Sequence, residues 1–562
     1  PRARNPAEVI DLMGTYYSKE NNLNGQAYID IKPFKGLTWT TKFAVDYVDR
    51  FFKTHQQSYN TYYLHFKSGG DYVERQGEVD KRGVTDDYLK EFTPTLYSVL
   101  NYHVELGEGH DLSALAGYEQ ISFGRRAIRA NRPYSSFPRL DELQAYSATD
   151  QSLFPSDDGK RLPSFKSPQE WALQSFFGRL NYSYKSKYLI EANLRYDGTS
   201  KVSPDYRWGL FPSVSAGWVI SEENFVENNI NWLSFFKIRG SYGVLGNQDI
   251  GTYLYQNTID VSGVYYPFEE SSLTQGGLIR EFKDQSLQWE TTRIVDLGID
   301  MNIFNGLFGV VFDWYDKYTY DILASQPVPK SMGFVSDPTG NNGKMRNWGF
   351  ELDLTHRYHI GELNYDVYFQ FAKYKNELIH IEATEIRSGT IREIGQPYNS
   401  YYMYIQEGIF QIADSISGDY PVHLANSDPR PGDLKIKDID GNDTINDLDR
   451  QIIDGAYPAF TYSFGFNLNY KRWNLSVFFQ GVQGRKVWAN YWSPTHHPFN
   501  SGTSPTVKWR DAWTPENPTN DLPAIFVSGW KGVSSYSNSD FFLMDASYLR
   551  LKNVMLSYSF PE

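Results

Sequence analysis

The 562-residue sequence contains no cysteine. Disulfide bonds and thiolate metal sites are therefore excluded, which suits an exported protein that does not depend on oxidation. The chain also lacks any apolar run near the ~20 residues that a membrane-spanning helix needs. Its mean hydropathy is −0.53. Together these properties argue against a helical membrane protein.

Positive charge is in short supply as well. The chain carries 54 Lys and Arg residues against 67 Asp and Glu residues, for a formal net charge of −13. Nucleic acid is therefore not expected as a partner, because neutralising phosphates requires a basic surface. The sequence also lacks the Gly-x-Ser-x-Gly, His-Glu-x-x-His and P-loop motifs. We therefore predict that the chain is not an enzyme.

Aromatic residues, by contrast, are abundant. Tyr, Phe and Trp make up 17% of the chain, which is high for a soluble protein. A transmembrane β-barrel reconciles this content with the low mean hydropathy, because every second residue of a barrel strand faces water.

The stretch 460–480 shows the expected pattern most clearly. Aromatic and aliphatic residues alternate with Thr, Ser, Gly and Asn as far as Tyr470, and the alternation resumes at Trp473 after the polar pair Lys471 and Arg472. Successive side chains of a strand point to opposite faces, so this pattern predicts a hairpin with one apolar and one polar face. About ten alternating residues with aromatic flanks is the span of one outer-membrane barrel strand.

Similar runs recur along the chain, and we expect about fifteen strands. They are predicted at residues 25–32, 37–48, 92–106, 111–121, 176–184, 188–197, 211–220, 236–245, 294–303, 307–321, 349–358, 363–374, 460–470, 473–480 and 547–560. Short turns alternate with long polar connections such as 49–89, 125–169, 246–288, 376–459 and 490–546. Outer-membrane barrels have short periplasmic turns and long extracellular loops, whereas a soluble sandwich has no reason to sort its loops in this way. The sequence therefore predicts an all-β fold, a transmembrane antiparallel barrel.

The alternation of loops also predicts whether an odd or an even number of strands is missing at each end. In an even-stranded barrel whose first strand ascends, an odd number of strands would precede residue 25 and an even number would follow residue 560. Five strands before and two after would give 22, the size of the plugged outer-membrane transporters. We therefore expect residues 1–562 to be one barrel portion, incomplete at both ends, without the plug domain and the final strands.

Several stretches resemble the SusC/RagA family of TonB-dependent outer-membrane transporters. Examples are residues 194–201 (Leu-Arg-Tyr-Asp-Gly-Thr-Ser-Lys) and 513–518 (Trp-Thr-Pro-Glu-Asn-Pro). Further matching stretches, in the family's order, are residues 207–218, 238–248, 288–292, 349–352, 478–482 and 547–554.

This resemblance implies a 22-stranded barrel in the outer membrane of a Gram-negative bacterium, surrounded by outer-membrane lipid. It also implies an N-terminal plug with a TonB-contacting segment, neither of which is in these residues, and a SusD-like surface lipoprotein that sits on the extracellular loops as a lid. Import would then be driven through TonB by the inner-membrane proton gradient.

One loop, residues 438–449, has the spacing of a calcium site. Asp438, Asp440, Asn442 and Asp449 occupy positions 1, 3, 5 and 12, and Thr444 offers a carbonyl at position 7. Ca²⁺ needs six to eight oxygens, which such a loop can present. Two departures from the pattern are the missing glycine at position 6 and Asp instead of Glu at position 12. We predict a structural Ca²⁺ site; the alternative is an acidic surface turn.

Other candidate residues have plainer alternatives. The neighbouring His496 and His497 have no evident third metal ligand, so we expect an ordinary loop pair. Lys237 and Arg239 are expected to face the lumen and to contact a plug rather than substrate. Loop aromatics could stack on sugar rings, line the membrane interface or pack against the lid; they are Tyr265, Tyr266, Tyr398, Tyr401, Tyr402, Tyr404, Trp488, Trp492 and Trp530.

The functional prediction that follows is an active importer of oligomers too large for porins, with oligosaccharides as the preferred cargo class. Some members of the family import peptides, so an oligopeptide importer is the first alternative. A passive porin and a surface-binding barrel are the others, and the long loops and family stretches argue against the porin. The sequence does not identify residues that contact the substrate.

Overall fold

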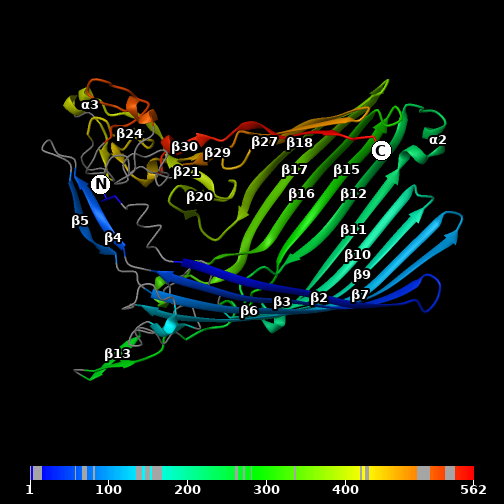
Figure 1. The fold of residues 1–562 in the computed structure, drawn as a ribbon, viewed down its shortest axis with the longest axis horizontal. Helices are drawn as coiled ribbons and strands as arrows, with labels where there is room; N and C mark the ends of the chain where they lie inside the picture. Colours follow the sequence, from blue (N-terminus) through cyan, green and yellow to red (C-terminus); the bar gives the residue numbers. More distant parts are fainter. Residues whose placement is uncertain are drawn as a thin grey trace.

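Fifteen long strands form one antiparallel sheet that curves into a barrel wall (Figure 1). The computed structural model describes residues 2–3, 15–56, 59–65, 72–79, 83–133, 142–145, 152–154, 168–259, 264–269, 272–279, 282–333, 337–417, 420–424, 430–489, 507–525 and 538–561. The wall strands, in spatial and chain order, are β2 (Thr15–Ile31), β3 (Leu37–Gln56), β6 (Gly83–Gly107), β7 (His110–Pro133), β9 (Gln169–Tyr184), β10 (Tyr188–Thr199), β11 (Trp208–Val219), β12 (Leu233–Asn247), β15 (Glu290–Ile303), β16 (Phe308–Ser325), β17 (Thr339–Ile360), β18 (Leu363–His380), β27 (Phe460–Tyr470), β28 (Trp473–Gln483) and β31 (Tyr548–Tyr558). Each predicted strand corresponds to one of them, so the all-β barrel prediction is confirmed.

The remaining elements outside the wall are short. Strand β8 (Ser152–Phe154) pairs with β7, β1 (Arg2–Ala3), β4 (Tyr59–His65) and β5 (Tyr72–Val79) form a small sheet, and β13 (Tyr265–Glu269) pairs with β14 (Ser272–Gln275). The helical turns that precede β17 in the described residues are η1 (Leu143–Ala145), η2 (Pro204–Tyr206), η3 (Ile220–Glu222), α2 (Asn224–Glu227) and η4 (Lys330–Met332). In the described part of the chain, no helix is both long enough and apolar enough to cross a membrane.

Strand β10 shows how the wall distributes its side chains. Its apolar residues Ile190 and Leu194 are each 50% exposed on the outer face, while Glu191, Asn193 and Arg195 alternate with them. Outward-facing apolar residues in a pleated wall are what a lipid environment requires, with the polar face turned to the lumen. The predicted alternation is therefore present in the folded strand.

The connections sort by end, as expected. Hairpin turns such as 185–187 and 471–472 lie at one end of the wall, the short-turn end, and the segments with β4, β5 and β13 lie at the other, the long-loop end (Figure 1). Two connections depart from this rule. Residues 200–207 at the long-loop end are brief, and residues 220–232 at the short-turn end contain η3 and α2.

Several strands continue beyond the predicted ends. Strand β3 extends to Gln56 and β6 begins at Gly83, and these two residues pair with each other. Both residues lie within the polar connection that the sequence predicts at 49–89, because the alternation of apolar residues stops there. Backbone pairing does not need an apolar face, so strands that project beyond the lipid lose the sequence signal without losing their hydrogen bonds.

The hairpin β27–β28 has the predicted turn and register. Phe464 lies opposite Phe479 with ring centroids 4.8 Å apart, and Leu468 lies opposite Leu475. Lys471, in the turn, has φ of 55°. The two segments on either side of this hairpin are the longest connections of the wall and together form the main feature of the long-loop end.

Candidate functional site: the outer cap and the inner wall

The two segments that flank the β27–β28 hairpin fold together into one unit, which we call the outer cap. It comprises the described parts of residues 381–459 and 484–547 and lies at the long-loop end (Figure 1). Its elements are β19 (Glu385–Ile386), β20 (Thr390–Arg392), β21 (Ser400–Tyr404), β22 (Gln406–Ile409), α3 (Ile412–Ser417), β23 (Val422–His423), β24 (Leu434–Ile436), β25 (Thr444–Ile445), η5 (Asp447–Asp449), β26 (Arg450–Ile453), β29 (Lys486–Trp488), η6 (Val507–Asp511), η7 (Asp540–Phe542) and β30 (Leu543–Asp545).

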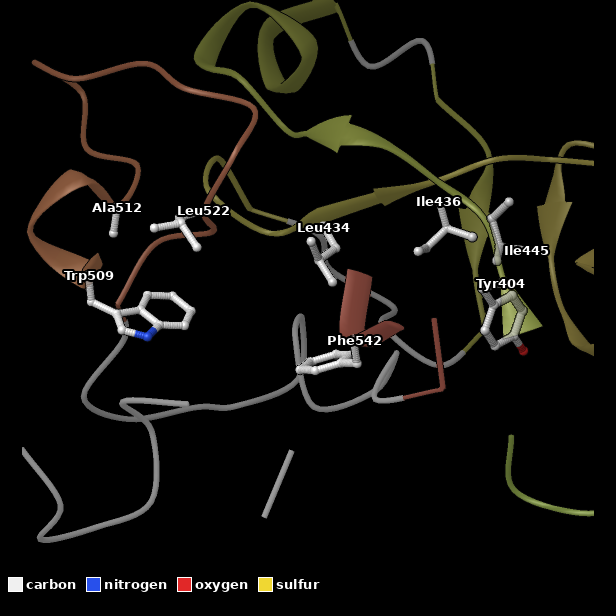
Figure 2. Close-up of a cluster of buried hydrophobic side chains, with 8 residues drawn as sticks. All are labelled: Tyr404, Leu434, Ile436, Ile445, Trp509, Ala512, Leu522 and Phe542. Atoms are coloured by element: carbon white, nitrogen blue, oxygen red, sulfur yellow. The ribbon is translucent and has the colours of Figure 1, made fainter. Parts of the chain in front are cut away.

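The outer cap has its own hydrophobic core, to which both segments contribute (Figure 2). Leu434 is fully buried, and Trp509 and Phe542 of the second segment are 4% and 3% exposed. The full cluster is Tyr404, Leu434, Ile436, Ile445, Trp509, Ala512, Leu522 and Phe542. Burying each large apolar side chain contributes about 1.5–3 kcal/mol, so the shared cluster stabilises the contact between the two segments.

Polar contacts join the same two segments. The Ala524 backbone N–H donates to the Gly432 carbonyl at 2.8 Å, and the Trp513 indole N–H donates to Gln411 Oε1 at 2.8 Å. Gly432 has φ of +95°, and a side chain there would collide with Ala524. A glycine is therefore required where the two segments cross.

The predicted calcium loop lies on this cap. Three of its five residues, Asp438, Asp440 and Asp449, bring one carboxylate oxygen each within 4.8 Å of one another. Asn442 Oδ1 accepts the Thr444 N–H, and the Thr444 carbonyl accepts from Asn446 Nδ2. The loop therefore gathers three carboxylates, while Asn442 and Thr444 also hold the turn together.

Backbone N–H groups stabilise the carboxylates of this loop. Asp449 is fully buried and accepts the N–H groups of Ile439 and Asn446, both at 2.8 Å. Asp438 accepts the N–H groups of Gly441 and Asp443. Desolvation raises the pKa of Asp438, but its hydrogen bonds outweigh this effect and leave the pKa below its ordinary value.

The loop aromatics have several different environments. Tyr404 belongs to the cap core and Trp488 packs against it. Tyr401 donates its hydroxyl to the Lys486 carbonyl, and the guanidinium of Arg392 lies 4.4 Å from the Tyr398 ring centroid.

Three further loop aromatics are described, and the other predicted loop residues lie outside the described ranges. Tyr402 donates a long hydrogen bond of 3.4 Å to the Asp447 carbonyl, and Tyr265 and Tyr266 are exposed on β13. Trp492, Trp530, His496 and His497 lie outside the described residues.

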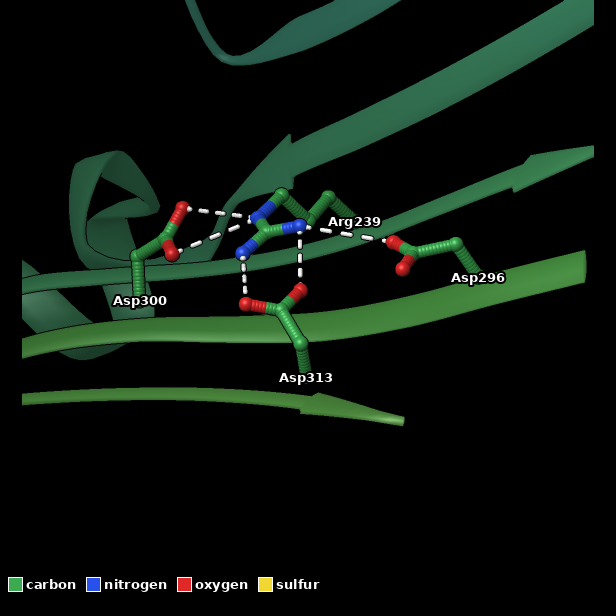
Figure 3. A network of polar contacts seen from close by, with 4 residues as sticks. All are labelled: Arg239, Asp296, Asp300 and Asp313. Atoms are coloured by element: carbon green, nitrogen blue, oxygen red, sulfur yellow. Dashed lines mark hydrogen bonds and ion pairs between the residues drawn. The ribbon is translucent and has the colours of Figure 1, made fainter. Parts of the chain in front are cut away.

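On the inner wall, Arg239 of β12 lies at the centre of a charged network (Figure 3). Its guanidinium contacts both oxygens of Asp313, with Nη1–Oδ1 at 2.6 Å and Nη2–Oδ2 at 2.8 Å. It also reaches Asp300 at 3.2 Å and Asp296 at 3.5 Å. Gly298 lies directly opposite Arg239, and a Cβ there would collide with the guanidinium. The glycine lets the arginine cross β15 to reach β16.

The prediction that Arg239 faces the lumen is consistent with this network, but its partners are carboxylates of the wall itself. Asp296, Asp300 and Asp313 were not singled out from the sequence. The signal was available, because Asp296 and Asp300 lie on the polar side of an alternating run. What the sequence could not supply was the neighbouring strand that brings Asp313 to the same place.

Lys237 and Arg239 also line a hollow of about 430 Å³ in the inner wall. Its floor carries the small residues Ser215, Gly217 and Ser241, and Glu191 lines it as well. Charged groups of both signs around a floor of small residues make this a surface on which a hydrophilic molecule or a polypeptide segment can lie closely.

Stretches that carry the family resemblance meet at the long-loop end of the wall. The Lys201 ammonium donates to the Gln248 carbonyl at 3.1 Å and lies 4.9 Å from the Trp171 ring centroid. The Trp289 indole N–H donates to the Arg207 carbonyl at 2.8 Å. Burial lowers the pKa of Lys201, and Asp249 partly offsets this effect. These stretches are separate in sequence and form one packed rim in the structure.

The wall, its outward apolar face and its polar lumen define an outer-membrane β-barrel. Residues 4–560 match the family model described as "TonB dependent receptor-like, beta-barrel", and the chain belongs to this family. The predicted resemblance to SusC/RagA barrels and the predicted outer-membrane location are confirmed.

Named relatives place the chain more closely. It is 31% identical to TonB-dependent receptor P3 of Formosa agariphila, over 70% of this chain and 39% of that protein. It is 28% identical to TonB-dependent receptor P26 of the same organism, over 98% of this chain and 53% of that protein. With TonB-dependent receptor SusC of Bacteroides thetaiotaomicron it shares 25% identity, over 83% of this chain and 44% of that protein.

Among solved structures, the RagAB peptide importer in its "open-open" state has a similar fold. The TM-score is 0.75 at 23% identity, covering 98% of this chain and 55% of that one. The chain thus spans about half the length of the proteins that it matches.

Proposed function

We propose that the protein containing this chain imports oligomeric nutrients actively across the outer membrane, with oligosaccharides as its preferred cargo. The outer cap is the observation that carries the proposal. A passive pore needs only an open mouth, whereas a packed unit built from two long segments offers a rigid surface for capturing cargo or a partner. The polar inner wall suits hydrophilic cargo.

We infer two protein partners, a SusD-like surface lipoprotein on the cap and TonB at the periplasmic side. Exposed apolar side chains on the cap support the first partner; Leu424, Leu448 and Val507 are 68%, 69% and 73% exposed. Large apolar side chains that are exposed to water are available for contact with a protein partner. Membership of a TonB-dependent family supports TonB as the second partner.

An oligopeptide importer is the second candidate function. It is favoured by the fold similarity to a structure described as a peptide importer. The two cargo classes share the same barrel, cap and partners, so they differ only in what the intact complex binds.

The test uses the full-length protein in its own host. A strain lacking the gene should fail to grow on a defined set of oligosaccharides, and loss of TonB should cause the same failure. Growth lost on peptides instead would support the second candidate, and uptake that survives loss of TonB would overturn active import. Binding of glycans and peptides to the purified complex, with and without its lipoprotein, provides the direct measurement.

We also propose that residues 438–449 bind a structural Ca²⁺ ion through Asp438, Asp440, Asn442, Thr444 and Asp449. The three gathered carboxylates support it, since Ca²⁺ prefers such oxygen ligands. Calorimetric titration of the EDTA-treated full-length protein should show calcium binding that Asp440→Asn weakens. If titrating the wild-type protein with calcium produces no heat of binding, residues 438–449 are an acidic surface turn and not a calcium site.

A further inference from the structure

A second cluster of metal-ligand side chains lies at the opposite end of the barrel from the calcium loop. His103 and Glu105 are near the end of β6, and Asp111 is near the start of β7, next to the hairpin turn at the short-turn end. One ligand atom from each of the three residues lies within 4.8 Å of the other two. The side chains of His103 and Asp111 are 55% and 45% exposed, so solvent ions can reach them.

The strand register places all three side chains on the inner face. Glu105 pairs directly with Asp111 and His103 pairs with Ser113, while Leu100 and Tyr102, at the alternate positions of β6, are 45% and 37% exposed on the outer face. Like charges directly opposite each other in an antiparallel pair destabilise the sheet. The Glu105–Asp111 pair is therefore a position where a bound cation would stabilise the hairpin.

The imidazole is already oriented for a ligand role. His103 Nδ1 is hydrogen-bonded to Ser113 Oγ at 2.9 Å, and Nε2 lies 3.6 Å from Asp111 Oδ2. Metal-binding histidines characteristically have one ring nitrogen held by such an outer partner, which fixes the direction of the other nitrogen. Here Ser113 holds Nδ1, and Nε2 is the nitrogen that lies beside the Asp111 carboxylate.

We propose that His103, Glu105 and Asp111 form a binding site for a divalent transition metal ion, with Zn²⁺ as its best occupant. Zinc takes one nitrogen and two carboxylate oxygens readily, at about 2.0–2.2 Å each, and accepts water as a fourth ligand. Donors around such an ion lie closer together than 4.8 Å, and the exposed side chains can close that gap by small rotations. The fourth position opens to the barrel lumen.

The choice of metal follows from the donor atoms. Ca²⁺ and Mg²⁺ prefer sites made of oxygen alone, as in residues 438–449, whereas imidazole nitrogen selects zinc and its neighbours. The two sites therefore differ both in chemistry and in their end of the barrel. This inference does not depend on the cargo or on the import function.

A simple ion pair between protonated His103 and Asp111 is the competing explanation. That pair accounts for the 3.6 Å contact but leaves Glu105 facing Asp111 without a cation of its own. A metal ion neutralises both carboxylates at once. The two explanations are distinguishable, since only one predicts metal binding.

The test is calorimetric titration of the EDTA-treated full-length protein in detergent with ZnCl₂, in excess calcium so that residues 438–449 do not contribute. One zinc site is expected, and His103→Ala, Glu105→Gln and Asp111→Asn should each weaken it by more than about tenfold. His359→Ala is the matched control, because His359 is another exposed histidine at the same end and should leave zinc binding unchanged. Cobalt titration adds a spectroscopic readout, since Co²⁺ in a four-coordinate site absorbs visible light.

Two results would overturn the proposal. One is a wild-type protein that takes up no zinc under these conditions. The ion pair between His103 and Asp111 would then be the explanation of the cluster. The other is zinc binding that all three substitutions leave unchanged. Electrophoresis verifies that each variant barrel has folded. An unheated folded barrel stays compact and migrates faster than the same sample after heating has unfolded it.

Discussion

The barrel wall and the outer cap solve the burial of apolar side chains in opposite ways. In the wall, Leu194 is 50% exposed on the outer face while polar groups line the interior. In the cap, Leu434 is fully buried, and apolar groups of two segments gather inward. The same residue type thus lies outside in one region and inside in the other.

This difference reflects the solvent on the outside of each region. Lipid is as apolar as leucine, so the wall gains nothing by hiding its apolar face and keeps its polar groups for the lumen. The cap is surrounded by water and must bury its apolar groups as any soluble unit does. The same chain therefore packs its apolar side chains in two ways, outward in the wall that faces lipid and inward in the cap that faces water.

The largest expected effect is in the cap core. Leu434→Ala should destabilise the outer cap by about 2–5 kcal/mol, because it leaves a cavity in a fully buried cluster. Limited proteolysis should then cleave the cap faster while the barrel itself stays folded. Leu194→Ala is the matched control, since the lipid-facing site has no packed core to lose. Equal protease sensitivity in the two variants would contradict the comparison.

The second effect tests the two faces of the wall. Leu194→Arg should cost about 2–4 kcal/mol if residue 194 lies near the bilayer midplane, and less near an interface. Ser215→Arg places the same charge on the lumen side, directly opposite Glu191, and should cost little. Urea unfolding of the two variants in lipid vesicles measures the difference. Similar losses in both would mean that the two faces had been assigned wrongly.

The third effect concerns the network of the inner wall. Arg239→Met should cost about 1.5–3 kcal/mol, because charged hydrogen bonds are lost and Asp296, Asp300 and Asp313 then repel one another. Acidification should partly restore the variant, because protonation removes the repulsion. Adding Asp313→Leu should also recover part of the loss. A variant with unchanged unfolding in urea would show that the network adds no stability.

The smallest effect is the pH dependence of the cap loop. The pKa of Asp438 is lowered in the folded state, so its contribution is present above the ordinary aspartate pKa and is lost as pH falls through the lower, folded value. Protease sensitivity of the cap in EDTA should therefore rise at acidic pH, and Asp438→Asn should reduce this dependence. Asp443→Asn is the control, as Asn tolerates the φ of 57° at that position. A pH profile unaffected by Asp438→Asn would exclude this carboxylate as the cause.

Much of the wall could be predicted from the sequence. The period-two alternation of Ile190 and Leu194 with Glu191 and Asn193 identified β10, and the same signal identified the other wall strands. The outer ends of β3 and β6 were missed because the alternation stops where the strands leave the lipid. The spacing of residues 438–449 singled them out, and the structure brings Asp438, Asp440 and Asp449 together. Binding of Ca²⁺ there stays a prediction.

The cap could not be predicted in the same way. Leu434 and Trp509 belong to stretches that the sequence predicts to be polar connections, and 74 residues lie between them in the chain. Only the folded chain brings them into one cluster, because their contact depends on the β27–β28 hairpin returning the chain to the same rim. The contacts of Arg239 with Asp313 and of Lys201 with Gln248 also join residues that are distant in the sequence, and they too arise only in the folded chain.

The sequence by itself therefore determined the membrane-facing wall. The period of the strands, the alternation of short turns with long loops, and the family all follow from local patterns. Lipid imposes the same alternation of side chains on every strand. Only the tertiary structure decided which residues meet, in the outer cap, in the charged network and in the His103 cluster. Those contacts join residues far apart in sequence or depend on the exact strand register. No local pattern records them.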